Sequence, residues 1–160
     1  MSNVDALRII LSDVLHGKYA HIDPIKALKG LTPDVARKKP AAGAQSIWEL
    51  LFHMAYWQEI VLLAYSGNEE AARKANDKAS WPTSDDMKKD DEWSHLVERF
   101  KTGLGKLVRS SKEDDLEKTL EIWGDAPLYY NLLVEIAHNS YHLGQIVAVR
   151  KVLNAWPPPE

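Results

Sequence analysis

Hydrophobic residues near the start of the chain recur every three or four positions, the spacing of one face of an α-helix. They are Val4, Leu7, Ile10, Leu11, Val14 and Leu15. We therefore expect a first helix that stops near Gly17. Short helical pieces should follow over residues 23–30 and from Thr32-Pro33-Asp34 onward, where a capping side chain precedes proline. Residues 38–44 contain proline and glycine and predict a loop.

Three longer segments predict three further helices. Ser46-Ile47-Trp48-Glu49 has the form of a capping box, so the second long helix should begin there and end near Gly67. Apolar residues at helical spacing predict a third helix over residues 87–110. The last helix should open at Asp125-Ala126-Pro127 and run to about Asn154, because the proline-rich residues that follow cannot continue it.

The second and third helices are joined by a polar, irregular stretch at residues 68–85, which contains Trp81-Pro82. This connection is long for a small helical protein, so we expect it to cross from one end of the molecule to the other. Residues 111–120 predict an added helical turn or a short extended piece. The pattern thus predicts an all-α protein, a four-helix bundle with a long crossover between helices 2 and 3, in one domain over residues 1–160.

Composition narrows the class of protein. A chain of 160 residues with 45% hydrophobic residues and six tryptophans can bury a sizeable core. The net charge of −3 argues against nucleic acid as a partner, since nucleic acid attracts a basic face. No apolar run is long enough to span a membrane, and the start of the chain lacks the pattern of a secretion signal. We therefore expect a soluble, cytoplasmic protein.

Three histidines lie in segments with almost no charge. His138 and His142 are four residues apart, and the only charged residue in residues 126–149 is Glu135. His53 lies in residues 47–65, whose only charged residues are two glutamates. On a helix the pair would share one face, at a spacing that suits one metal ion. The chain has no cysteine, so a metal would be held by imidazole, carboxylate or water.

An ordinary structural role is the alternative for these histidines. Each imidazole could instead form a hydrogen bond with a nearby carbonyl or hydroxyl group inside the core. The spacing alone is a weak signal, and it is not the zinc-protease motif, because Asn139 stands where that motif needs its glutamate. With His53 added, three imidazoles from two helices would leave a coordination position for water or substrate.

Other residues are candidates for catalysis. Glu49 lies one turn before His53 and is either the capping-box glutamate or a base that supports the site. Tyr141 and Gln145 either line a pocket or pack in the core, and Trp57 is more typical of core than of a substrate platform. Three more histidines, His16, His21 and His95, are expected on the surface or in loops. A loop histidine such as His21 can reach over the open end of a bundle.

The chain resembles a known family in two main motifs. Residues 46–53, SIWELLFH, followed by Trp57, are similar to the second-helix motif of the DinB/YfiT-like superfamily. Residues 138–146, HNSYHLGQI, resemble its last-helix motif. The order and separation of these motifs also fit, as do residues 28–33 and Trp81-Pro82.

The resemblance implies a four-helix bundle with a long crossover, and frequent homodimers. It also implies that His53, His138 and His142 bind a divalent metal such as zinc or nickel, with iron, cobalt or manganese as further options. Relatives include metal-dependent S-transferases that use low-molecular-weight thiols such as bacillithiol or mycothiol, and a thiol-dependent isomerase. The family motif often has aspartate after its first histidine, where this chain has Asn139. No residue pattern here selects a particular thiol or electrophile.

Three hypotheses follow. The first is a metal-dependent enzyme that activates a small thiol or a water, with thiol transfer favoured over hydrolysis by the resemblance alone. The second is a bundle without catalytic activity that binds a metal or a ligand. The third is an interaction module in which aromatic-rich helices form a dimer interface.

Overall fold

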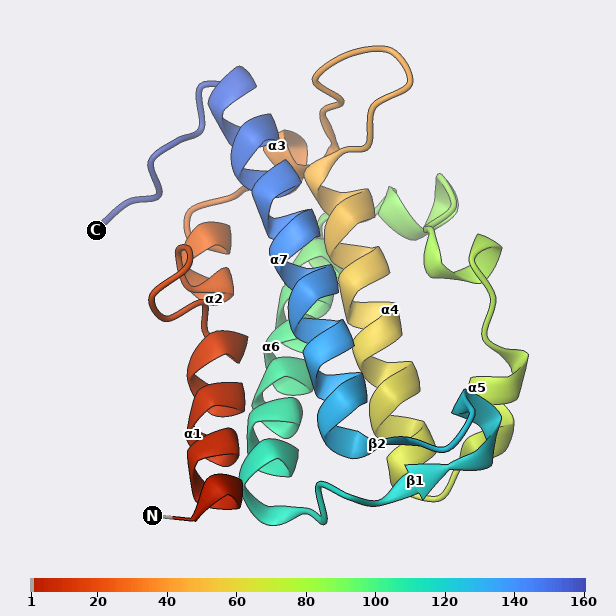
Figure 1. The fold of residues 1–160 in the computed structure, drawn as a ribbon. Coiled ribbons are helices and arrows are strands. Elements are labelled where there is room, and N and C mark those ends of the chain that lie inside the picture. Colours follow the sequence, from red (N-terminus) through yellow and green to blue (C-terminus); the bar gives the residue numbers. More distant parts are fainter. Residues whose placement is uncertain (1) are drawn as a thin grey trace.

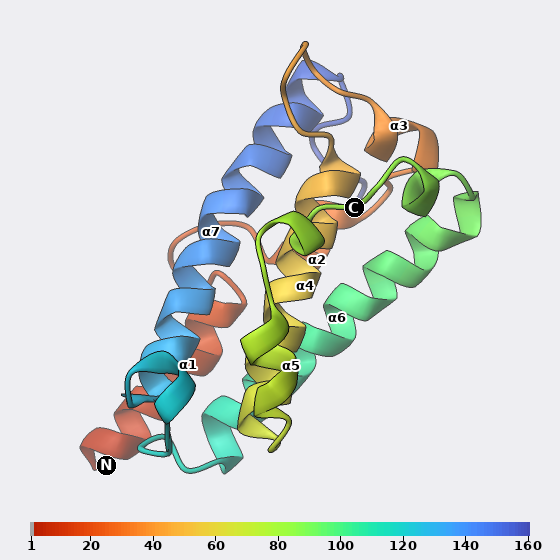
Figure 2. The same cartoon turned by 90° about the vertical axis from the view of Figure 1, so that its right-hand side faces the viewer.

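Residues 2–160 are described by a computed structural model, which is mostly helical (Figure 1). The all-α prediction is confirmed. The four longest helices are α1 (Asn3–Leu15), α4 (Ile47–Tyr65), α6 (Asp90–Glu113) and α7 (Leu128–Val152). Both α6 and α7 contact α4 and also α1, so the four helices enclose one interior. As Figures 1 and 2 show, α1 and α7 run in one direction while α4 and α6 run in the other.

The first part of the chain follows the predicted pattern. Helix α1 ends at Leu15, and the chain turns through Gly17, whose φ of 72° lies in the left-handed region that favours glycine. The short helices α2 (Pro24–Leu28) and α3 (Pro33–Arg37) follow. Each begins with proline after a side-chain cap, as the sequence predicts. Residues 38–46 then form the loop before α4.

Helix α4 begins with the predicted capping box. The Ser46 hydroxyl accepts a hydrogen bond from the Glu49 backbone N–H at 3.2 Å, and the Glu49 carboxylate accepts one from the Ser46 N–H at 2.7 Å. These two bonds satisfy backbone donors that the first helical turn leaves free. The helix is followed by Gly67, whose φ is 100°. The predicted second helix is therefore correct at both ends.

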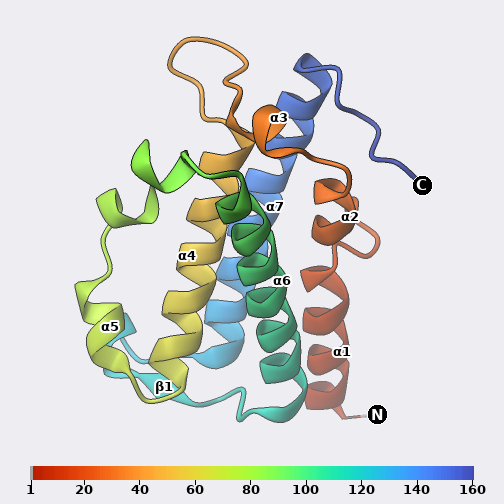
Figure 3. The same ribbon diagram turned by 180° about the vertical axis from the view of Figure 1, so that it is seen from behind.

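The connection between α4 and α6 is more regular than its sequence suggests. It contains α5 (Glu69–Lys74) and two 3₁₀ turns, η1 (Lys78–Ser80) and η2 (Asp85–Met87). An asparagine side chain caps α5, because the Asn68 amide oxygen accepts from the Ala71 N–H at 3.3 Å. Figure 3 shows this segment beside α4, running from the end of α4 to the start of α6. The expectation of an irregular stretch is therefore wrong for these turns.

The bounds of the two later long helices differ slightly from the prediction. Helix α6 spans Asp90–Glu113, three residues later at each end than the predicted 87–110. Met87 belongs to η2 instead, and the three acidic residues of the first α6 turn interact favourably with the helix dipole. Beyond α6, β1 (Thr119–Leu120) pairs antiparallel with β2 (Ala126–Pro127) around the 3₁₀ turn η3 (Glu121–Trp123). Because residues 126–127 are extended, α7 begins only at Leu128.

The apolar core lies between the four long helices. Trp48 and Phe100 are its largest fully buried apolar side chains, and Trp48 packs against Trp93 with ring centroids 5.3 Å apart. A smaller apolar cluster lies under α5 and β1, formed by Ile60, Ala64, Ala72 and Leu120. The His53 side chain belongs to neither cluster and lies on the side of α4 that faces α7. No helix in residues 2–160 is both long and apolar enough to cross a membrane.

Candidate metal centre

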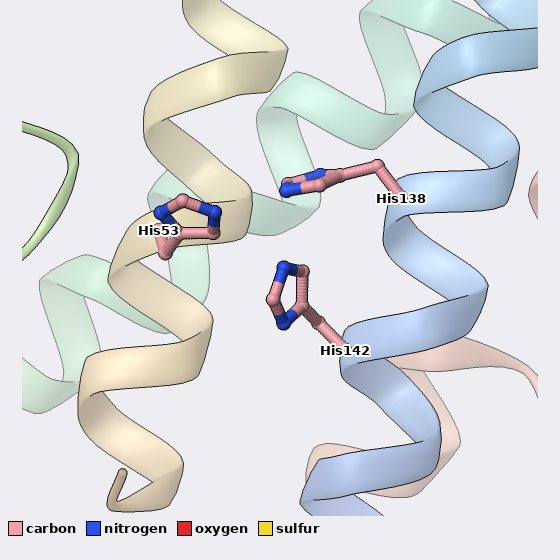
Figure 4. A group of neighbouring side chains, drawn as sticks. All are labelled: His53, His138 and His142. Carbon is pink, nitrogen blue, oxygen red and sulfur yellow. The ribbon is translucent and has the colours of Figure 1, made fainter. Parts of the chain in front are cut away.

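The three histidines singled out in the sequence converge in the structure. His53 projects from α4, and His138 and His142 project from successive turns of α7 toward it (Figure 4). One ring nitrogen of each lies within 4.8 Å of the corresponding nitrogens of the other two. The ring centroids are 5.0 Å apart for His53 and His138, 4.8 Å for His53 and His142, and 4.5 Å for the α7 pair.

A serine from the α4–α6 connection sets the protonation of His53. The Ser80 hydroxyl lies 2.8 Å from His53 Nδ1 and donates its own hydrogen to the Asp77 carbonyl at 2.6 Å. Because that hydrogen is already used, the hydroxyl accepts a hydrogen bond from the Nδ1–H of His53. The Nε2 atom of His53 therefore carries the lone pair that a metal requires.

A glutamine has the same effect on His142. Its Nδ1 lies 2.6 Å from the Gln145 amide oxygen, which can only accept, so the hydrogen is on Nδ1. Nε2 of His142 is therefore also free to bind a metal. Gln145 was predicted either to line a pocket or to pack in the core, and the structure places it against this histidine.

His138 faces a buried carboxylate. Its Nδ1 lies 3.9 Å from Glu135 Oε1, and within residues 2–160 neither atom has a hydrogen-bond partner. The Glu135 side chain lies on the inner side of α7 with only 3% of the residue exposed. Burial raises the pKa of Glu135, while His138 and Asn139 act in the opposite direction.

The surroundings of His53 and His142 favour their neutral forms. Burial, together with repulsion from a charged His138 or His142, lowers the pKa of His53 to about 4. Burial also lowers the pKa of His142, partly opposed by its hydrogen bond to Gln145. Neutral imidazole is the form that binds metals. Three inward nitrogen donors on two packed helices could thus hold a metal ion.

This shift in the pKa of His53 predicts a loss of stability in acid. Folding lowers this pKa from 6.5 to about 4, so the unfolded chain binds the proton more readily. The contribution of neutral His53 to the free energy of unfolding is complete above pH 6.5 and is lost as the pH falls toward 4. Urea unfolding of the metal-free protein at pH 7 and near pH 4.5 should show about 2 kcal/mol of loss from this group. Between the same two pH values, the free energy of unfolding of His53→Gln should fall by about 2 kcal/mol less than that of the wild type. An equal fall in both proteins would contradict the prediction.

Aromatic rings surround the centre. Trp81, from the α4–α6 connection, stacks on His53 with centroids 4.1 Å apart and planes 14° from parallel. The edge of Trp57 meets His53 at 6.4 Å, and Tyr141 meets His142 at 5.0 Å. Tyr141 is 66% exposed, so packing in the core does not explain it. Trp57 is half-buried and packs against the smaller apolar cluster, as the core interpretation predicts, while its ring also meets His53.

The remaining candidates lie outside the three-histidine group. Glu49 completes the capping box and forms an ion pair with Lys39 at 2.9 Å. Although burial alone would raise its pKa, these contacts hold the pKa of Glu49 below its usual value. His21 forms a hydrogen bond with the Ser140 hydroxyl of α7 at 2.9 Å. His16 pairs with Asp23 and His95 is exposed, as expected for surface residues.

Sequence reasoning missed three contributors to the site. Ser80 and Trp81 lie in a segment without periodic pattern, so periodicity does not connect them to His53, although Trp81-Pro82 is part of the family resemblance. Glu135 did carry a signal. It is the only charged residue in residues 126–149, and it lies one turn before His138.

A family model for the DinB superfamily matches residues 25–146, well over half of the chain. The chain belongs to the DinB superfamily. This confirms the resemblance seen in the two sequence motifs, and the matched range includes all three histidines. No significant match was found among curated proteins or among solved structures. Membership of the DinB superfamily and the histidine group together fit a metal-binding protein.

Proposed function

We propose that this DinB-superfamily chain is a divalent-metal-dependent enzyme whose metal is held by His53, His138 and His142. One observation supports this most directly. The Nδ1 atoms of His53 and His142 are engaged by Ser80 and Gln145, so their Nε2 lone pairs are available on the side where the three rings converge. We propose zinc or nickel as the metal, since imidazole ligands suit both; iron, cobalt and manganese are further options.

The bundle architecture supports such a site. We propose that α1, α4, α6 and α7 form a four-helix bundle whose second and third long helices are joined by residues 66–89 as a crossover. Facing helices of a bundle commonly supply inward metal ligands. Here the crossover adds Ser80 and Trp81 to the same place, so it would both orient His53 and limit access of water.

Three protein ligands leave a position open for catalysis. A divalent metal in this setting supplies Lewis acidity, which lowers the pKa of a water or thiol bound at its open position. We propose that the substrate is a low-molecular-weight thiol, which the enzyme transfers to an electrophile, with hydrolysis as the alternative. Trp81 and Trp57 would pack against the substrate, and the exposed Tyr141 hydroxyl would form hydrogen bonds with it. Such thiols stay reduced in the cytosol, so we also propose a cytoplasmic location.

Activity assays would test this proposal. Zinc- or nickel-loaded protein would be supplied with small thiols and a chromogenic aryl halide, and separately with chromogenic esters and amides. Thiol transfer that is lost in His53→Ala and retained in His95→Ala would support the first reaction. Ester or amide hydrolysis with the same dependence would support the alternative, and inactivity of the loaded protein in both assays would contradict catalysis.

A second candidate is a metal- or ligand-binding bundle without catalysis. This candidate is favoured because Glu49 is engaged in the helix cap and in an ion pair with Lys39. The site then has no established general base. Removing the metal would distinguish the two. A structural metal should be needed for a cooperative unfolding transition, whereas a catalytic site should lose its metal with the fold retained.

We also propose that the protein forms a homodimer through the outer face of α7. This face exposes Tyr130, Leu133, Val134 and Tyr141, and the only charge in residues 126–149, Glu135, is buried. An uncharged, partly apolar face suits an identical face of a second copy, packed about a two-fold axis. Size-exclusion chromatography with light scattering should give twice the chain mass, and Val134→Asp should give a monomer. A monomeric wild-type protein would contradict the proposal.

A further inference from the structure

Glu135 is placed where a carboxylate is costly. It lies on the inner side of α7, with 3% of the residue exposed, and is the only charged residue in that stretch of the helix. A buried carboxylate loses its hydration and must be paired or hydrogen bonded to be tolerated. Within residues 2–160 its Oε1 atom has no hydrogen-bond partner. The fold itself therefore does not account for this group.

One unused hydrogen-bond partner belongs to a proposed metal ligand. His138 Nδ1 is buried, lacks a hydrogen bond among the described residues and lies 3.9 Å from Glu135 Oε1. The two side chains are three residues apart on one helix, so they are neighbours along the same face. The distance is too long for a hydrogen bond but short enough for side-chain rotation alone to reach the 2.7–2.9 Å of a charge-assisted bond.

The other two histidines show what this contact would complete. His53 and His142 already have Nδ1 partners, in Ser80 and Gln145. Of these three, only His138 lacks an Nδ1 partner among the described residues, and this Nδ1 atom faces the Glu135 carboxylate. A partner for the distant nitrogen of a metal-binding histidine fixes its tautomer and raises its basicity as a ligand.

We propose that Glu135 is the positioning residue for His138, accepting its Nδ1–H when a divalent metal is bound at Nε2. This rests on the proposed metal site and goes beyond it by naming the group that balances the charge. Three neutral imidazoles would leave the double positive charge of the metal uncompensated, and an ionised Glu135 would contribute one buried negative charge beside His138. The buried Asn139 amide, which has no partner in residues 2–160, lies one turn further on and can donate to the same carboxylate.

The test compares two matched substitutions. Glu135→Gln keeps the shape of the side chain and removes its charge, and Glu98→Gln makes the same change at an exposed position of α6. The affinity for Zn²⁺ would be measured by competition with a chromogenic chelator, and metal-free stability by urea unfolding. We expect Glu135→Gln to weaken binding by about 10- to 100-fold, with the unfolding midpoint of the metal-free protein unchanged or higher. Glu98→Gln should bind like the wild type.

Two outcomes would overturn this inference and leave the metal site intact. One is wild-type affinity in Glu135→Gln while His53→Ala loses the metal. The other is that metal-free Glu135→Gln unfolds at a lower urea concentration than the wild type, by an amount that matches its loss of Zn²⁺ affinity. That result would show a purely structural role for Glu135. Wild-type protein that binds no Zn²⁺ would overturn the proposed metal site and this inference together.

Discussion

Replacing His53 with alanine is expected to weaken the binding of Zn²⁺ or Ni²⁺ by more than about 100-fold. Loss of an outer partner of a ligand alone costs about 10- to 100-fold, and loss of a ligand should cost more. The group has three imidazole donors, so only the pair on α7 would remain to bind the metal. Chelator competition and elemental analysis of protein purified without added metal would measure the effect.

The same experiment has a matched control in the chain. His95 is an exposed histidine on α6, outside the three-histidine group, so His95→Ala should retain wild-type affinity and stoichiometry. His142→Ala should behave like His53→Ala, because both contribute one donor to a common centre. Wild-type affinity in either of the two ligand variants would contradict the site, provided that circular dichroism shows native helix content.

Saturating metal is expected to raise the melting temperature of the wild-type protein by roughly 10 °C. A ligand that binds only the folded state at 1,000 times its Kd stabilises it by about 4 kcal/mol. For a chain of this length each kcal/mol shifts the melting temperature by about 2–4 °C. The apolar core between the long helices does not include the histidines, so the metal-free protein should still unfold cooperatively.

Two controls test whether the rise in melting temperature comes from metal bound at the three histidines. His53→Ala should show little or no shift, because it lacks one donor of the centre. Mg²⁺ prefers oxygen ligands and should not stabilise the wild-type protein. An equal shift in His53→Ala would place the binding elsewhere on the protein. Loss of the cooperative transition on chelation would instead favour a structural metal over an open catalytic site.

The sequence by itself determined the helices, since these depend on local patterns, and it singled out the three histidines as candidate metal ligands. Capping side chains act within three or four residues, so Ser46 and Glu49 could be identified as a cap before any fold was known. The spacing of His138 and His142 places them on one helix face whatever surrounds the helix. The bounds of α6 were less accurate, because Met87 belongs to a 3₁₀ turn and the helix begins only at the acidic turn that starts with Asp90.

Only the tertiary structure decided what each histidine contacts. Ser80 is 27 residues from His53 and reaches it through a connection without periodic pattern. Glu135 could be recognised in the sequence as an isolated charge, but α7 is apolar nearly all round, so periodicity does not show which face is the inner one. Contacts between distant segments depend on how the helices pack, and packing reflects the shapes of many side chains at once. For that reason the candidate ligands could be named from the sequence, while the groups that contact them required the fold.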